Sequence, residues 1–323
     1  MNSRRSLPSS GLTAALMLTC ALVISSLGSL LSQTSETQNG STSTAAIVLG
    51  VGSPNIDAER SGTSIGVMAA GRLYVFDAGA GVERRIMEAS PKLATRKVQK
   101  FGPVFISHLH FDHTIGLAAL ISYHNFNSKS LLTGGGDLTV YGPGPVNGAP
   151  GIGAVIDHYR GAGFFGGAGV APGIRAEELG GGILQVQAIE LKSGVVYRDS
   201  SVVVTAFEVA HKSAIAFGFR VQTADRVIVI SGDTRPVDAV IEACNGCDLL
   251  FHEVFDLSYG AGGPTGDAQG HTSAAELGEL ARRARPKHLV IYHDVRAPHD
   301  AALEVIGRKF PGKVTFARDL DIF

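Results

Sequence analysis

The stretch Ser107-His108-Leu109-His110-Phe111-Asp112-His113 contains three of the chain's 11 histidines and decides how the fold is interpreted. His108 and His110 are two residues apart, so in extended backbone their side chains face the same way. Asp112 and His113 follow where the chain turns into a predicted helix, which lets four ligand-type side chains surround one cavity. Three imidazoles and a carboxylate within six residues suit zinc. A run of solvated surface residues is disfavoured, because the apolar residues 104–106 lead directly into the stretch as a buried strand.

Three more residues of metal-binding type follow apolar runs elsewhere in the chain. His211 follows the predicted strand 202–209, Asp233 follows the strand 227–230, and His293 follows the strand 288–292. Loops at strand ends are where a rigid scaffold presents chemistry. A single histidine after a strand is more often structural. Three such residues together with the His-x-His-x-Asp-His run predict one metal centre.

Short apolar runs alternate with Gly-rich turns and amphipathic stretches from residue 45 to the C-terminus. The order is β-rich first and then mixed β and α, and no long linker interrupts it. We therefore predict one α+β domain over residues 45–323, an αββα sandwich of two sheets with helices outside both faces. The remaining strands are predicted over 45–50, 73–76, 104–106, 216–221 and 249–251, and the helices over 82–89, 114–123 and 273–284.

The N-terminus has the pattern of an export signal. Arg4 and Arg5 precede the uncharged, apolar residues 11–31, and the small residues Ser26 and Gly28 offer a cleavage site. We expect a signal peptide over 1–31, a flexible linker over 32–44, and a periplasmic or secreted protein. An uncleaved N-terminal membrane anchor stays open as the alternative, because the stretch is long enough to span a bilayer.

Composition indicates a globular chain with no strong electrostatic preference. Apolar residues make up 45% and charged residues 18%, and the formal net charge is −1. Nothing in that balance points to a polyanionic partner. Residues 134–182 are Gly-rich, with Arg160 and Arg175 as their basic residues, and are expected to form an irregular insertion beside the site, with a short helix around 155–159. Cys244 and Cys247 fit either a disulfide in an exported protein or two buried thiols.

The chain resembles the metallo-β-lactamase superfamily, and within it the branch of ribonuclease Z, the zinc arylsulfatases and the class II cyclic-nucleotide phosphodiesterases. The resemblance extends from residue 45 to the C-terminus. Eight segments carry it in order: Leu49-Gly50-Val51-Gly52-Ser53-Pro54, Phe76-Asp77-Ala78-Gly79-Ala80-Gly81, the His108–His113 run, His211, Ser231-Gly232-Asp233-Thr234, His252-Glu253, Gly270-His271-Thr272-Ser273 and Tyr292-His293.

The resemblance implies two zinc ions per chain, with manganese or iron as alternatives at such a His/Asp site. It implies that Asp233 bridges the two metals. It places His108, His110 and His211 on one metal, and Asp112, His113 and His293 on the other. For Asp77 it implies a supporting contact to the metal loop, whereas the local sequence alone equally suits a turn-forming Asp before Gly.

A second chemical unit is implied by the same resemblance. Asp112, His271 and Glu253 are the residues it marks as catalytic, with His271 as the general acid and Glu253 holding its imidazole. A carboxylate behind a histidine orients the ring and can raise its pKa. The alternative is that His271 caps the helix that begins near Ser273, although Thr272 or Ser273 can cap that helix instead.

These features favour hydrolysis of a small ester, namely an aryl sulfate, a phosphodiester or a cyclic nucleotide. The partner is then a small molecule and not a nucleic acid, because the cation-poor insertion and the export signal disfavour tRNA. A homodimer is the expected assembly if the chain associates at all, and no membrane is involved unless the signal stays uncleaved. The alternatives are a ribonuclease Z-like tRNA 3′-endonuclease, a β-lactam hydrolase and a non-catalytic metal-binding protein.

Overall fold

The computed structural model describes residues 43–55, 57–126, 137–161, 186–212, 214–255, 270–295 and 298–323. The expected signal peptide and nearly all of the expected linker lie outside the described residues. Among the described residues, no helix has the length and apolar character needed to cross a membrane.

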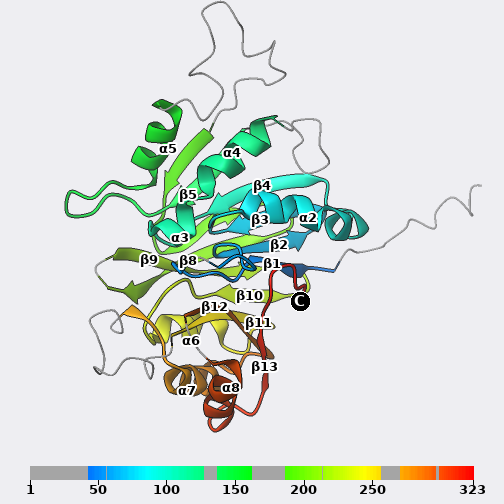
Figure 1. Cartoon of the computed structure of the whole chain (residues 1–323), viewed down its shortest axis with the longest axis vertical. Helices are drawn as coiled ribbons and strands as arrows, with labels where there is room; N and C mark the ends of the chain where they lie inside the picture. The colour runs from blue at the N-terminus through cyan, green and yellow to red at the C-terminus, as the bar shows by residue number, and fades with distance from the viewer. Residues whose placement is uncertain are drawn as a thin grey trace, which may run out of the picture. The chain divides into compact units, whose positions relative to one another are not determined.

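The first sheet has six strands in the order β1-β2-β3-β4-β5-β6 (Figure 1). The strands β1 to β3 form an antiparallel meander, and β3 to β6 run parallel to one another. Parallel strands need crossover connections, and the helices on this sheet's outer face supply them. The strands are β1 (Ala45–Gly50), β2 (Ser64–Ala69), β3 (Arg72–Phe76), β4 (Lys100–Phe105), β5 (Leu138–Gly142) and β6 (Val186–Glu190).

The second sheet has seven strands in the order β13-β12-β11-β10-β9-β8-β7. The strands β10 to β13 are parallel, and β7 to β10 are antiparallel neighbours. As a result, β8, β10, β11 and β12 all point the same way and end at one edge. The strands are β7 (Gly194–Arg198), β8 (Val203–His211), β9 (Ala214–Gln222), β10 (Val227–Ile230), β11 (Leu249–Phe255), β12 (His288–Val295) and β13 (Lys313–Phe316).

Helices cover the outer face of each sheet, which confirms the αββα sandwich (Figure 1). Between the sheets lies an aromatic core, in which the Phe105 ring stacks on Phe76 at 4.9 Å and meets Phe219 of the other sheet at 5.8 Å. Burial on both faces explains why β1 and β2 are fully buried runs and do not alternate. The helices are α2 (Val82–Thr95), α3 (Phe111–Thr114), α4 (Leu117–Phe126) and α5 (Ile152–Gly161) on the first half, and α6 (Asp238–Cys244), α7 (Ala274–Ala284) and α8 (His299–Gly307) on the second.

The Gly-rich segment 134–182 differs from its prediction as an irregular insertion. Its residues Leu138–Gly142 form β5, which pairs with β4 on one side and β6 on the other. The short helix expected around 155–159 is part of α5. Glycine density hid β5, because Gly134 to Gly136 precede it and Gly142 ends it. The remainder, 162–182, lies outside the described residues.

Cys244 and Cys247 form a disulfide, which decides between the two alternatives left by the sequence. The bridge ties the end of α6 to the turn that precedes β11. Both cysteines are buried, so the pair is part of the core beneath α7.

Candidate metal centre

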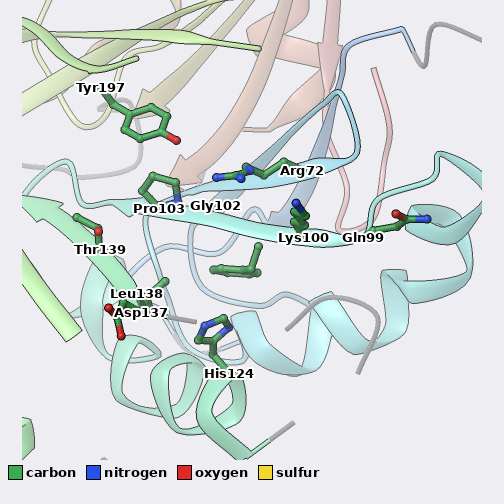
Figure 2. A pocket seen from close by; sticks show the side chains of 11 residues that line it. Arg72, Gln99, Lys100, Gly102, Pro103, His124, Asp137, Leu138, Thr139 and Tyr197 are labelled. Carbon is green, nitrogen blue, oxygen red and sulfur yellow. The ribbon is translucent and has the colours of Figure 1, made fainter. Parts of the chain in front are cut away.

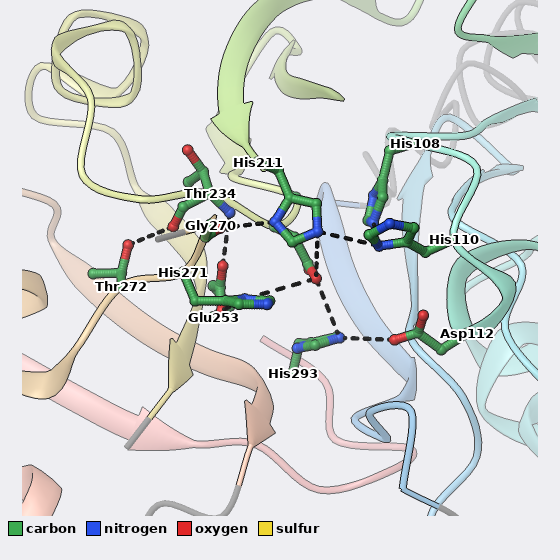
Figure 3. A network of polar contacts seen from close by, with 12 residues as sticks. His108, His110, Asp112, His211, Thr234, Glu253, Gly270, His271, Thr272 and His293 are labelled. Carbon is green, nitrogen blue, oxygen red and sulfur yellow. Dashed lines mark hydrogen bonds and ion pairs between the residues drawn. The ribbon is translucent and has the colours of Figure 1, made fainter. Parts of the chain in front are cut away.

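The site is assembled where the carboxyl ends of strands from both sheets meet. The backbone leaves β4 and reaches the His108–His113 run before α3 begins. His211 is the last residue of β8, and Asp233 follows β10. His293 lies inside β12, which continues to Val295, so its strand is longer than predicted. The shared strand direction is what brings residues so far apart in sequence to one place (Figure 3).

The first group of nitrogens belongs to His108, His110 and His211. The Nε2 of His108 lies 3.0 Å from His110 Nδ1, and the Nε2 of His211 lies 3.1 Å from the same atom. Two nitrogens on one tetrahedral zinc, at Zn–N distances of about 2.0–2.1 Å, are separated by about 3.3 Å. The one lone pair on His110 Nδ1 cannot accept a hydrogen bond from both neighbouring nitrogens. A cation between the three nitrogens would interact with one lone pair from each ring.

The second group contains Asp112, His113 and His293. Asp112 Oδ2 lies 3.1 Å from His293 Nε2 and 3.6 Å from His113 Nε2. The candidate ligand atoms of these three residues lie within 4.8 Å of one another, as do those of the first group. All three residues are buried, with exposures of 4% or less. Two separate sets of three candidate ligands therefore stand side by side.

Asp233 lies between the two groups. Its Oδ1 is 3.3 Å from His113 Nε2, and its Oδ2 is 3.7 Å from His293 Nε2 and 4.0 Å from His211 Nε2. Only 2% of its surface is exposed. Burial alone would raise the pKa of this carboxyl, but the surrounding imidazoles, His293 first, hold the pKa well below its usual range. A buried carboxylate in contact with both groups is placed to bridge two cations.

The unsatisfied polar atoms of the site fit bound cations. His113 Nε2 and Asp233 Oδ1 are buried and have no hydrogen-bond partner, a costly state for isolated polar groups. The opposite ring nitrogens are already engaged: His113 Nδ1 donates to Asp77 Oδ2 at 2.9 Å, and His211 Nδ1 donates to the Gly270 carbonyl at 2.7 Å. Such contacts fix the tautomer that leaves Nε2 free to bind a metal.

Asp77 combines both of the roles considered for it. Its backbone is left-handed, with φ at 60°, as a turn residue would be. Its carboxylate also accepts from the Ser107 N–H at 2.7 Å and from the Ser107 hydroxyl at 2.9 Å, besides His113. Ser107, to which the sequence assigns no role of its own, links Asp77 to His108 Nδ1 at 3.0 Å.

His271 and Glu253 form a contact pair beside Asp233, on the opposite side of the cluster from His108 and His110 (Figure 3). His271 Nδ1 lies 2.7 Å from Glu253 Oε2 and 3.9 Å from Asp233 Oδ2. The Thr234 N–H donates to Glu253 Oε1 at 2.7 Å and so fixes the carboxyl. The helix cap belongs to Ser273, whose hydroxyl accepts from the Glu276 N–H, so His271 is not needed there.

The expected rise in the pKa of His271 is wrong. Burial, the largest influence, lowers the pKa of His271 to about 4 and outweighs the carboxylate of Asp233. Burial, reinforced by Asp233, raises the pKa of Glu253 well above its ordinary value. This burial was not visible in the sequence, because it depends on residues distant from His271: the Phe255 ring stacks on it at 5.0 Å and the His211 ring lies 4.7 Å away.

A cavity of about 440 Å³ lies away from this centre, at the amino ends of β3, β4 and β5 (Figure 2). Arg72, Lys100, His124, Asp137 and Tyr197 are among its lining residues. The metal-binding groups sit at the carboxyl ends of the strands, so this cavity is at the other end of the first sheet and is not part of the candidate centre.

Comparisons with known proteins agree with the geometry. Residues 72–293 match the family described as the β-lactamase superfamily domain. Ribonuclease Z from Methanothermobacter thermautotrophicus is 28% identical over 282 residues, covering 76% of this chain and 84% of the relative. Among solved structures, the metallo-β-lactamase fold protein YhfI from Bacillus subtilis aligns with a TM-score of 0.65 at 17% identity, covering 87% of this chain and 98% of that one. The short form of human tRNase Z aligns with a TM-score of 0.61 at 22% identity, covering 86% and 98%.

The fold and the grouped histidines and aspartates define a metal-dependent hydrolase that acts on ester bonds. The chain belongs to the β-lactamase superfamily domain family, in its metallo-β-lactamase branch near ribonuclease Z. Divalent metal binding follows from this membership together with the His/Asp groups.

One expectation is overturned by these relatives. The chain was predicted to have no nucleic-acid partner, but relatives that align over three-quarters of its length are named ribonuclease Z. The prediction relied on the scarcity of Lys and Arg in residues 134–182 and on the export signal. The first reason failed because part of the segment is the core strand β5 and not a substrate-binding arm.

Proposed function

We propose that this protein is a metal-dependent phosphodiesterase that cleaves RNA in the manner of ribonuclease Z. The observation that carries the proposal is the position of His271, 3.9 Å from the carboxylate shared by two sets of candidate metal ligands. A water-activating centre next to a proton donor is what hydrolysis of an unactivated diester requires. The ribonuclease Z relatives, which align along most of their own length, support RNA as the substrate class.

The residues proposed to hold two divalent ions are the seven described above, and zinc suits them best. His108, His110 and His211 would bind one ion; Asp112, His113 and His293 the other; and Asp233 both. Ions bound there would supply positive charge to activate a water for attack and to stabilise the charge that builds up on the phosphate. Asp77 and Ser107 hold the rings of His113 and His108 in position for this.

His271 supplies the proton that the leaving group needs. Hydrolysis adds one water across a P–O bond, and the departing ribose oxygen must gain a proton. Because Nδ1 of His271 faces Glu253, its Nε2 is the ring nitrogen left to face the substrate. Burial lowers the pKa of His271 to about 4, so in the free protein the protonated ring is a minor form at neutral pH, and the transferable proton has to be retained on Nε2 when the substrate binds. Glu253 and Thr234 keep the ring oriented throughout.

The test is turnover by the zinc-loaded protein of a tRNA precursor with a 3′ extension, an unstructured RNA, a bis-aryl phosphodiester and an aryl sulfate. We expect zinc-dependent RNA cleavage and slower turnover of the bis-aryl phosphodiester. The Asp233→Ala variant, purified in parallel, controls for contaminating ribonucleases. Hydrolysis of the aryl sulfate without any RNA cleavage by metal-loaded protein would contradict the proposal.

We further propose that the protein acts outside the cytoplasm. Two features support this: the charged and then apolar pattern of residues 1–31, and the Cys244–Cys247 disulfide. Disulfides persist in oxidising compartments and are rare in the cytosol. The RNA substrate would then be one that reaches the periplasm or the exterior.

A further inference from the structure

Large apolar side chains are exposed at only a few places in the described part of the chain. Four of them are more than half exposed: Met87, Phe111, Ile115 and Val195, at 52%, 58%, 56% and 58%. Two of the four, Phe111 and Ile115, lie on the single turn that carries Asp112 and His113. The Ile115 N–H donates to the Phe111 carbonyl at 2.7 Å, so the turn is helical and both side chains share one face.

After this turn the helical hydrogen bonding is interrupted, because the Gly116 N–H donates to the Ala78 carbonyl, and a second helix, α4, begins at Leu117. Ala119 is exposed and Tyr123 is half-buried, each four residues beyond the last. The Tyr123 hydroxyl contacts the sulfur of Met87 on α2. We call the row Phe111, Ile115, Ala119 and Tyr123 the apolar ridge. An exposed helical face is ordinarily polar, and this one has no charged member.

The ridge starts at the mouth of the candidate centre. Phe111 stands between His110 and Asp112, whose side chains belong to the two groups of candidate ligands. His110 is itself partly exposed, so solvent reaches the centre beside Phe111. A polymer whose phosphate occupies the centre must lay its neighbouring nucleotides over the surrounding rim. Residues 111–126 contain no Lys or Arg, so this part of the rim has no such cation to bind phosphates. It presents the aromatic ring of Phe111 to the bases instead.

We propose that Phe111 stacks on the base next to the scissile phosphate of an RNA strand, and that the ridge carries the strand onward. The inference rests on the proposed function. Every base has a π-face, so stacking on an aromatic side chain is tolerant of sequence. Each such contact changes affinity by about 10- to 100-fold. A second copy of this chain is the competing occupant, but seated on the ridge it would cover the opening beside His110.

The chain contains no tryptophan, which makes the stacking directly observable. Phe111→Trp introduces a single tryptophan, whose emission can be excited apart from that of the seven tyrosines. Val195→Trp is the matched control, an equally exposed apolar position on β7. Both are made in the full chain with His271→Ala, so that RNA binds with little turnover. The probes are a single-stranded oligoadenylate and an abasic ribose-phosphate strand of the same length.

We expect oligoadenylate to quench the emission of the Phe111→Trp protein in a saturable titration, and the abasic strand to leave it unquenched. The Val195→Trp protein should respond to neither strand. Equal quenching by both strands, or no quenching by either, would overturn the proposal. If oligoadenylate quenches the emission but the unmodified chain cleaves no RNA, the proposed function is wrong and the base-binding proposal still holds.

Kinetics provide the second measurement. Phe111→Ala should lower kcat/KM for RNA at least tenfold more than for methyl p-nitrophenyl phosphate, a diester without a base. Phe111→Tyr should restore RNA cleavage, and Phe111→Leu, apolar but without a ring, should not. Sedimentation of the same variants measures their oligomeric state and so tests whether a second copy of the chain occupies the ridge. A dimer that dissociates on Phe111→Ala, with RNA cleavage unaltered, would show that the ridge joins two copies and would overturn the proposal.

Discussion

At the scale of single residues, the centre depends most on Asp233, which contacts both groups of histidines. We expect Asp233→Ala to release or disorder both metals and to abolish turnover, because among the described residues no other carboxylate contacts both groups of histidines. Metal content of the dialysed protein, measured beside its circular dichroism, checks this. Asp157→Ala, which alters an exposed carboxylate on α5, should retain both metals. Full metal content in the Asp233→Ala protein would show that Asp233 is not needed to bridge the two metals.

His271 should behave differently from the ligands. We expect His271→Ala to keep both metals and to slow diesters with poor leaving groups by about 10²–10⁴-fold. Activated aryl esters should lose less, because their leaving oxygens need little protonation. The comparison of an RNA with a bis-aryl phosphodiester measures the difference. Equal losses on the two substrates would show that His271 only shapes the site.

Asp77 acts through the residues that it holds. Its carboxylate accepts from Ser107 and His113, and Asp77→Ala removes both supports. We expect metal affinity to fall by about 10- to 100-fold, as for other carboxylates that orient a metal-binding histidine. Competition with a zinc chelator measures the affinity, and Asp77→Asn, which keeps the shape and an acceptor, should lose less. An unchanged metal affinity in both variants would show that Asp77 serves only as a turn residue.

The structure brings together the residues that carry local signals in the sequence, and their role as metal ligands stays a prediction. His108 to His113 follow a buried strand, and His211 and Asp233 close other strands. Burial was not predictable in the same way. It depends on segments far apart in the chain, so the low pKa of His271 and the linking role of Ser107 appear only in the folded structure.

At the scale of elements, hydrophobic runs located most strands within a few residues, such as β1 and β10. The strands that were not predicted have small or polar residues at positions where a hydrophobic run would otherwise indicate a strand. β2 has Ser64 and Gly66 within a fully buried strand, and the edge strand β7 is largely exposed. Gly66 is needed because a Cβ there would come within 2.9 Å of Leu73 and Ile47 side chains.

The Gly-rich loop after β3 positions the ligand turn by close backbone contact. A Cβ on Gly79 would lie 2.4 Å from the Gly62 backbone and 2.5 Å from the Asp112 carbonyl oxygen. Gly79→Ala must therefore displace the backbone of a candidate ligand. We expect it to destabilise the fold by about 1–3 kcal/mol and to weaken metal binding. Thermal unfolding with and without zinc tests this, with Gly153→Ala, where a Cβ meets nothing within 4 Å, as the control.

At the scale of the whole molecule, the two sheets contribute to one candidate metal centre. The second sheet alone supplies His211, Asp233 and His293, and the first sheet contributes the His108–His113 turn. Neither half holds a complete set of candidate ligands. Metal binding should therefore stabilise the packing between the sheets.

The compartment in which this molecule works determines which RNA it can meet, and an export experiment can identify that compartment. We expect the full chain, expressed in a Gram-negative host, to appear in the periplasm with its N-terminus removed near Ser26 to Gly28. Cys244 and Cys247 should then resist thiol reagents in denaturant, because oxidation follows export. Leu22→Arg, which interrupts the apolar stretch, should keep the protein in the cytoplasm with both thiols reactive. Export with an intact N-terminus would identify residues 11–31 as an anchor. Cytoplasmic retention of the unmodified chain would instead bring it into contact with tRNA precursors, and the 3′-endonuclease activity would become the first to measure.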